Sequence, residues 1–134
     1  ADLLIEMLPA YLAGSILPEK QNEADATYTG MIRKEESVLD FSQTAVELER
    51  KVRAYQPWPI ARIVIRDMTL GVLKATAVTC PQAQAGIPYI INKTPAIGTF
   101  SGLLVLDDVQ PAGKKSMPGK AFLNGIKNWG EVIS

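Results

Sequence analysis

The sequence predicts a mainly β protein, in which a small closed antiparallel barrel carries one early and one late helix and follows a separate helix and a linker. Between residues 61 and 109, short runs rich in β-branched residues alternate with turn residues, which is typical of an antiparallel sheet. Helical patterns lie on both sides of these runs. Hydrophobic residues make up 47% of the 134 residues, which is enough to close one core without disulfide bonds.

Residues 1–17 predict a helix that does not belong to the barrel. Apolar residues recur there at helical spacing: Leu4, Met7, Leu8 and Tyr11. Pro9 removes one backbone donor and would kink the helix, and Gly14 suits its end. A lone helix of this length is marginal in water, so we expect it to be the terminal helix of a preceding domain. Residues 18–36 are polar and acidic with little periodicity, which predicts a linker.

Residues 37–134 predict the barrel domain, which starts with a helix. Apolar residues of this helix recur on one face: Ala45, Leu48, Val52 and Tyr55. Thr44 and Glu47 have the spacing of a capping box, in which each residue binds the backbone N–H of the other. Pro57 and Pro59 then prevent the helix from continuing. The early helix is therefore predicted to be capped by Ser42 or Thr44 and to be ended by Pro57 and Pro59.

Strands are predicted at residues 61–66, 70–78, 89–92, 96–99 and 103–109. The last of these is apolar on both faces at its centre, which favours an interior strand. A helix from about Pro118 to Asn124 follows, with Pro in its first turn and Gly125 just past its end. Because closure removes exposed strand edges, a barrel of the oligonucleotide-binding type fits this pattern best.

The net charge of zero hides a strong asymmetry along the chain. Residues 1–49 contain ten acids and three bases, whereas residues 50–134 contain eleven bases and four acids. The net charge is therefore 3 − 10 = −7 for residues 1–49 and 11 − 4 = +7 for residues 50–134. The basic part is the natural candidate for a surface that binds a polyanion. Charge alone leaves open the alternative that these bases only keep the domain soluble.

The composition excludes the common catalytic and metal-binding sites. The chain has no histidine and one cysteine, Cys80. A Ser-His-Asp or Cys-His unit is therefore impossible, and a zinc site lacks ligands. We predict no catalytic residues and no metal ligands in this chain. Its apolar runs are too short to cross a bilayer, and no secretory signal pattern is present, so no membrane contact is expected.

Two adjacent lysines stand at a well-defined corner. Lys114 and Lys115 follow the turn residues Pro111–Gly113, which come four residues after the apolar run 103–106. The core strand thus ends in a turn that places two positive charges at the surface, which favours a binding function.

Among the aromatic residues, Trp58 lies between two prolines and has two interpretations. It can stack on a nucleobase or pack into the barrel beside Tyr55, and we favour packing.

Two blocks of sequence resemble the C-terminal domain of methionyl-tRNA formyltransferase. The first runs from Leu39-Asp40-Phe41-Ser42 to Pro57-Trp58-Pro59, and the second is Gln110-Pro111-Ala112-Gly113-Lys114-Lys115-Ser116-Met117. Upstream, Lys34-Glu35-Glu36 is similar to the interdomain linker of that family, and Leu8–Gly14 to the last helix of its catalytic domain. One departure is Phe41, which stands where the family usually has Trp.

The resemblance implies that this chain is the tRNA-binding C-terminal domain of such an enzyme. That enzyme transfers a formyl group from 10-formyltetrahydrofolate, its co-substrate, to the amino group of initiator methionyl-tRNA. The catalytic residues of the family lie in an N-terminal domain, so the chain by itself is expected to be inactive and to hold no cofactor. The resemblance also implies a monomer in the bacterial cytoplasm, or in the mitochondrial matrix of a eukaryote.

The resemblance further implies a positively charged channel along the inner face of tRNA. Phosphate contacts from Lys and Arg give salt-dependent affinity and carry no sequence information. We predict phosphate contacts from Arg50, Lys51, Arg53, Lys114, Lys115, Lys120 and Lys127, with Arg62 and Arg66 as secondary candidates. The alternative function is a structural or protein-interaction barrel, and salt-dependent retention on RNA separates the two.

Overall fold

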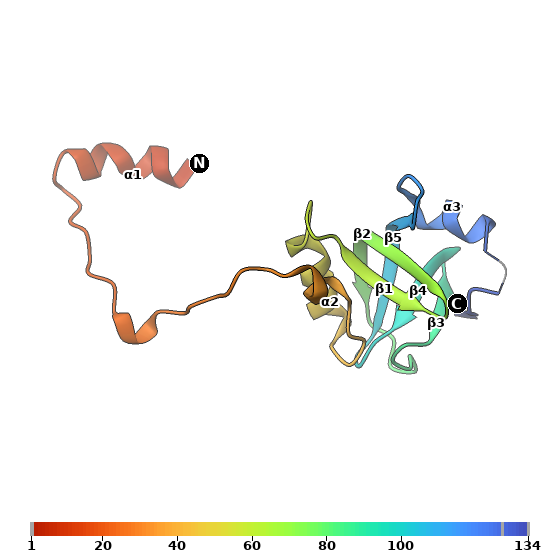
Figure 1. Ribbon diagram of the computed structural model, residues 1–134. Coiled ribbons are helices and arrows are strands. Elements are labelled where there is room, and N and C mark those ends of the chain that lie inside the picture. Colours follow the sequence, from red (N-terminus) through yellow and green to blue (C-terminus); the bar gives the residue numbers. More distant parts are fainter. Residues whose placement is uncertain (1, 127, 134) are drawn as a thin grey trace. The chain divides into compact units, whose positions relative to one another are not determined.

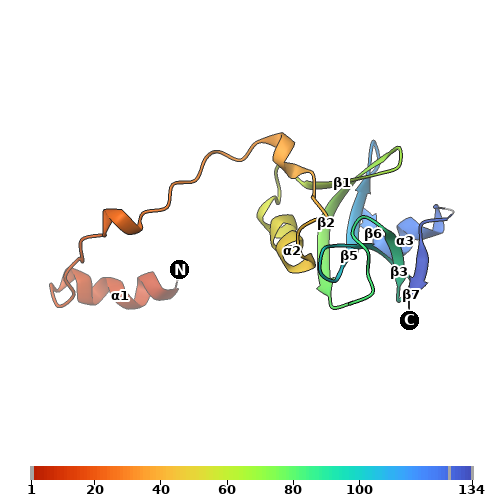
Figure 2. The ribbon, with the colours of Figure 1, turned by 90° about the horizontal axis from the view of Figure 1, so that it is seen from below.

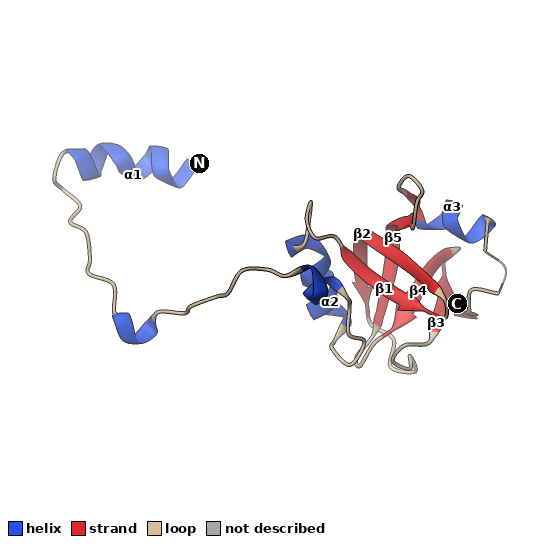
Figure 3. Ribbon diagram, in the orientation of Figure 1, coloured by secondary structure: helices blue, strands red, loops and turns tan. Residues whose placement is uncertain are grey.

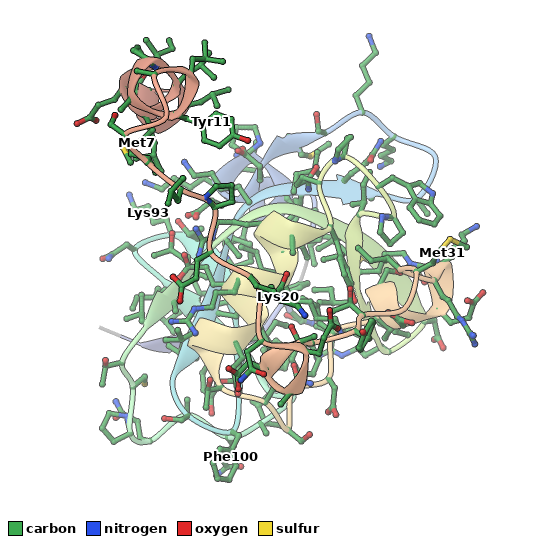
Figure 4. All side chains as sticks on the ribbon, turned by 90° about the vertical axis from the view of Figure 1, so that its left-hand side faces the viewer. Met7, Tyr11, Lys20, Met31, Lys93 and Phe100 are labelled. Carbon is green, nitrogen blue, oxygen red and sulfur yellow. The ribbon has the colours of Figure 1, made fainter. Side chains whose placement is uncertain are left out.

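The structure is a computed structural model that describes residues 2–126 and 128–133. The chain forms two compact units, Ala1–Met31 and Ile32–Ser134, and Figure 1 labels their elements. The first unit contains helix α1 (Asp2–Leu12) and the short 3-10 helix η1 (Glu23–Asp25). No residue of α1 is buried, and Met7 and Tyr11 project from it with exposed side chains (Figure 4). The predicted helix is therefore present, and its apolar residues have no partner within its own unit.

Within the described part of the chain, no helix has the length and apolar character needed to cross a membrane.

The second unit is built on one sheet, which contains seven strands among the described residues (Figure 3). The strands are β1 (Ala61–Ile65), β2 (Met68–Val78), β3 (Pro88–Ile91), β4 (Thr94–Gly98), β5 (Leu103–Pro111), β6 (Met117–Pro118) and β7 (Glu131–Ile133). Their order is β1-β2-β5-β4-β3-β7, and β6 pairs with β5. All pairs are antiparallel except β3 with β7. As predicted, β5 is central and mostly buried.

The sheet is not closed by hydrogen bonds, so the predicted closed barrel is not confirmed. In the described residues, β1 and β7 stand at the two ends of the strand order and do not pair. The outer edge of β1 is instead bridged by the segment that precedes helix α2 (Ala45–Ala54). In this segment Leu39 N donates to Arg62 O at 2.8 Å. This segment therefore occupies the edge of β1 at Arg62.

Helix α2 (Ala45–Ala54) begins where the capping box predicts. Thr44 Oγ1 accepts a hydrogen bond from Glu47 N, and Thr44 N donates to Glu47 Oε2 at 2.8 Å. The Thr44 backbone N–H and the Thr44 hydroxyl both donate to the Glu47 carboxylate, which lowers the pKa of this carboxyl below its ordinary value. The predicted apolar face is buried against the sheet, chiefly against β2: Ala45, Leu48, Val52 and Tyr55. Amphipathic packing and the cap together explain this helix.

Replacing Thr44 by alanine is expected to lower the free energy of unfolding by about 1 kcal/mol, because an N-cap side chain satisfies a backbone N–H that otherwise has no partner. Urea denaturation followed by circular dichroism measures this loss. Thr44→Ser keeps the hydroxyl and should retain most of the stability. Equal stability of the alanine and serine variants would show that the hydroxyl of the cap contributes nothing.

The C-terminal segment adds helix α3 (Gly119–Asn124) and returns to the core at Trp129. As predicted, Gly125 follows the last turn of α3. The Trp129 side chain is 3% exposed, its indole N–H donates to Tyr89 O at 3.0 Å, and its ring meets Phe122 edge to face at 5.4 Å. In Figure 2, β7 lies beside β3 next to this segment. Trp129 therefore anchors the C-terminal tail.

The favoured interpretation of Trp58 is wrong, because its side chain is 60% exposed. Tyr55 already fills the core at this end of α2, and Ile60 N donates to Tyr55 O at 3.0 Å, which closes the loop between them. This short closed loop turns Trp58 outward. A second exposed aromatic residue, Phe100, projects away from the sheet at the β4–β5 turn (Figure 4).

Deleting residues 1–17 is expected to leave the second unit folded with unchanged cooperativity, because its core is formed by residues of 39–129 alone. Thermal unfolding of the shortened and the complete chain makes the comparison. A fall in the midpoint of more than a few degrees, or a broadened transition, would assign α1 to the fold of the second unit.

Candidate nucleic-acid interface

The β5–β6 turn holds the two adjacent lysines in a defined conformation. Gly113 adopts φ +73°, a left-handed conformation that glycine tolerates without strain. Lys114 N donates to Pro111 O at 3.0 Å, and the Gln110 side-chain amide donates to Lys114 O at 3.1 Å. The backbone of the turn is therefore fixed, while the Lys114 and Lys115 side chains are exposed. Such a turn presents two ammonium groups to solvent at little conformational cost to its backbone.

A second pair of lysines surrounds the open hollow beside α3. Lys120 on α3 and Lys93 in the β3–β4 turn both line this hollow, whose volume is about 600 Å³. Its floor is apolar and includes Ile90 and Leu123. Lys93 was missing from the sequence-based set. It stands in a two-residue turn with Asn92, in which both residues have positive φ. The sequence signal for this turn is the polar Asn92-Lys93 pair between two strand-like runs, which indicates a hairpin turn with an exposed lysine.

The guanidinium groups of Arg62 and Arg66 donate hydrogen bonds within the protein. Arg62 Nε donates to Ser37 Oγ at 2.9 Å, and Arg62 Nη2 donates to Lys34 O at 3.1 Å. Arg66 Nη1 donates to Asn128 O at 3.1 Å. These bonds attach the segment before α2 to β1 and the C-terminal tail to the β1–β2 turn. Part of the hydrogen-bonding capacity of both guanidinium groups is therefore used within the protein.

Helix α2 carries three further predicted residues, and two of them have intramolecular contacts. Lys51 Nζ lies 5.5 Å from the centre of the Tyr55 ring, a cation–π contact. Arg53 Nε lies 3.9 Å from a carboxylate oxygen of Glu49, one turn earlier. Arg50 is exposed. Among the side chains that the structure describes, Arg53–Glu49 is the one ion pair within 4.0 Å.

The N-terminal end of α2 is negatively charged. A hydrogen bond from the Ser42 backbone N–H lowers the pKa of the Asp40 carboxyl below its ordinary value, and Glu47 is held as an anion by Thr44. At the opposite end, burial raises the pKa of the Tyr55 hydroxyl, and the charge of Glu36 adds to this effect. A phosphate would therefore be attracted to the later residues of α2 and repelled from its first turn.

Lys93 and most of the predicted cations fall into two groups in the structure. Figures 1 and 2 agree in placing α2 and α3 at opposite ends of the sheet. The α3 group is Lys93, Lys114, Lys115 and Lys120, and the α2 group is Arg50, Lys51 and Arg53. Arg62 and Arg66 lie on the β1–β2 hairpin. Lys127, which the sequence also predicted, lies outside the described residues.

Within residues 2–126 and 128–133, no three Cys, Asp or Glu side chains come together as a metal site would need. The described surface presents positive charges at several places, and two exposed aromatic rings, Trp58 and Phe100, are among its apolar residues. Such a surface suits the binding of phosphate groups and bases.

Residues 31–127 match the family described as "Formyl transferase, C-terminal domain". Among curated proteins, the methionyl-tRNA formyltransferase of Roseiflexus sp. (strain RS-1) is 37% identical over 129 residues, which are 95% of this chain and 40% of that protein. The methionyl-tRNA formyltransferase of Bacillus subtilis (strain 168) is 39% identical over 129 residues, or 93% and 40% of the two chains. The chain thus spans about two-fifths of the length of these relatives.

Solved structures show the same fold at low sequence identity. HypX from Aquifex aeolicus, crystallised in complex with tetrahydrofolic acid, matches with a TM-score of 0.62 at 16% identity and covers 98% of this chain and 24% of its own. A variant of HypX gives a TM-score of 0.61 at 18% identity. The matched family extends over residues 31–127 and so includes α2, the sheet strands β1–β6 and α3. The chain belongs to the formyl transferase C-terminal domain family.

Proposed function

We propose that this chain is the tRNA-binding C-terminal domain of a methionyl-tRNA formyltransferase. The observation that carries the proposal is the β5–β6 turn, whose fixed backbone presents Lys114 and Lys115 to solvent. Lys93 and Lys120 add to this positive surface from either side of the neighbouring hollow. The names of the curated relatives support tRNA as the polyanion.

The proposed mechanism of binding is electrostatic. Lysine side chains at the surface neutralise phosphates and release counterions, so affinity falls as salt rises. Phosphate contacts fix the position of an RNA but carry no sequence information. In this proposal the α3 group binds the backbone first, and the later residues of α2 together with Arg62, Arg66 and Lys127 extend the contact around the domain. The oligonucleotide-binding type of barrel would give these groups a common curved surface.

The formyl transfer itself is assigned to the remainder of the enzyme. Its donor would be 10-formyltetrahydrofolate, which agrees with the tetrahydrofolic acid bound to HypX. We propose that residues 1–17 are the terminal helix of that catalytic part and that residues 18–36 link the two. The enzyme would act as a monomer, without a metal, in the cytoplasm of a bacterium. The purified 134-residue chain should show no formylation of methionyl-tRNA.

Replacing Lys114 and Lys115 together by alanine is expected to weaken binding of initiator and elongator tRNA equally. The slope of log K against log salt should flatten by roughly 0.7–0.9 for each phosphate that the variant no longer neutralises. Filter binding or fluorescence anisotropy at several salt concentrations measures both quantities. Stability should change little, because exposed charges contribute little to folding.

A matched control removes two lysines from elsewhere. Lys20 lies in the first unit and Lys74 on β2, outside both groups of predicted cations. Replacing this pair by alanine changes the net charge equally and should leave the salt slope close to that of the unmodified chain. If both double variants lose the same affinity, only overall charge matters. If neither loses any, the domain is better described as a structural or protein-interaction module.

A further inference from the structure

We propose that the α2–β1 loop and the β5–β6 turn form a site for one unpaired nucleotide of RNA, in which Trp58 stacks on the base while Lys114 and Lys115 contact the flanking phosphates. This inference rests on the proposed function. It adds a base contact, which phosphate binding alone does not need.

A hollow of about 290 Å³ separates the two segments. Pro59 and Ile60 line one side of it, and residues 111–113 line the other. Its floor is the outer face of the sheet at Gly71. In the paired strands Gly71 stands between Arg62 on β1 and Gln110 on β5. Gly71 adds no side chain to the hollow, and a Cβ atom there would already be in ordinary contact with Gln110 and Ile60.

The aromatic residue and the lysines are the chain neighbours of the two walls of this hollow. Trp58 directly precedes Pro59 in one wall, and Lys114 and Lys115 directly follow Gly113 in the other. With 60% of its surface exposed, Trp58 contributes little to the core of the domain. A large exposed aromatic ring is the kind of residue that dominates the energetics of binding surfaces.

The loop that carries Trp58 is held in a restrained conformation. Ile60 has φ +62°, a left-handed conformation that a β-branched residue rarely adopts. Its N–H donates to Tyr55 O at 3.0 Å, and Tyr55 is buried in the core. Such strain persists where the surrounding structure enforces it, and it clusters at ligand-binding positions. The restrained loop keeps the Trp58 backbone in place before a ligand arrives.

The charges around the hollow favour RNA over a protein partner. Arg62 is the charged residue in its lining, and no acidic side chain lines it among the described residues. Proteins bind single-stranded nucleic acids with a positively charged groove and an aromatic platform. Here Arg62 lines the hollow, and Lys114 and Lys115 follow its wall in sequence. The volume lies just below the range of about 300–1,000 Å³ for small-molecule pockets, which suits a single base. Thr69 and Gln110 supply polar groups at its edge.

The affinity test uses a single-stranded RNA of about 12 nucleotides and a blunt duplex of the same length. Trp58→Ala should bind the single strand about 5- to 150-fold more weakly, with an unchanged salt slope, because stacking releases no counterions. Binding of the duplex should not change, since its bases are already stacked. Trp58→Phe keeps an aromatic ring and should recover most of the affinity for the single strand.

A spectroscopic test needs no loss of affinity. Stacking on a base should quench the tryptophan fluorescence of the unmodified chain when the single strand is added. The quenching should disappear in Trp58→Phe, although the buried Trp129 is still present. Phe100→Ala is the matched control, because Phe100 is 74% exposed and no charged residue lines the neighbouring hollow among the described residues. This control should bind both RNAs as the unmodified chain does.

Three results would overturn the inference. Unchanged affinity of Trp58→Ala for the single strand, with a reduced salt slope in the Lys114 and Lys115 double variant, would leave phosphate binding intact and remove the base contact. A change in self-association alone, measured by sedimentation, would assign Trp58 to a contact between copies of the chain. If the unmodified chain binds neither RNA at low salt, the inference and the proposed function fall together.

Discussion

Trp129→Ala is expected to lower the free energy of unfolding of the second unit by about 3–5 kcal/mol, the usual loss for removing a large buried aromatic side chain. The indole is 3% exposed and packs edge to face on Phe122 at 5.4 Å. It also supplies the N–H that binds Tyr89 O at 3.0 Å. The variant therefore loses buried apolar area, an aromatic pair and the hydrogen bond that joins the tail to β3.

Urea denaturation measures this loss, and the other tryptophan provides the matched control. Trp58→Ala removes the same side chain from a position that is 60% exposed, so its free energy of unfolding should change by less than about 0.5 kcal/mol. The contrast tests whether burial, and not the type of residue, decides the effect. Losses of similar size in the two variants would contradict the assignment of Trp129 to the core.

Gly119→Ala is expected to destabilise the domain by at least about 3 kcal/mol, at the upper end of the cost of overpacking. Gly119 is the buried first residue of α3. A Cβ atom there would overlap the carbonyl oxygen of Leu106 on the central strand β5, and it would lie 2.9 Å from Pro95 Cδ. Relief requires α3 to move away from β5, because the backbone of a central strand cannot shift freely.

The opposite end of the same helix supplies the control. Gly125 has φ −97°, and a Cβ atom there would lie 3.7 Å from Phe122 O, an ordinary contact. Gly125→Ala should therefore leave the stability unchanged or raise it by less than about 1 kcal/mol. Thermal and urea unfolding of the two variants make the comparison. A small effect of Gly119→Ala would mean that α3 is not fixed against β5.

The early helix shows how far local patterns determine structure. Thr44 and Glu47 form the predicted capping box, and the predicted apolar positions of α2 are the buried ones. Cap and periodicity act within a few residues, so they can be read without the rest of the chain. The same holds for Gly125 at the end of α3.

The strand pairing was less accessible to sequence patterns. The short strands β6 and β7 were not predicted, because two- and three-residue strands have no periodicity to detect. Closure of the sheet was expected from general arguments about strand edges. The edge of β1 is instead covered by Leu39, which lies more than twenty residues away in the sequence.

Some features of the candidate site also follow from the sequence, and others depend on the folded structure. That Lys114 and Lys115 lie exposed in a turn follows from the sequence, because a Pro-Gly turn after an apolar strand must lie at the surface. The inclusion of Lys93 and the internal bonds of Arg62 and Arg66 do not follow from it. Each depends on a neighbour brought close by folding.

The sequence by itself determined the two helices of the domain, the central strand β5, the exposed dilysine turn and the family, because each rests on short-range patterns or on two blocks of similar residues. Only the tertiary structure decided which of the two tryptophans is buried and which is exposed. Trp58 and Trp129 are chemically identical, and local sequence does not tell them apart. Trp129 is buried because the tail returns to the sheet beside Phe122, whereas Trp58 is turned outward because Tyr55 already fills its place.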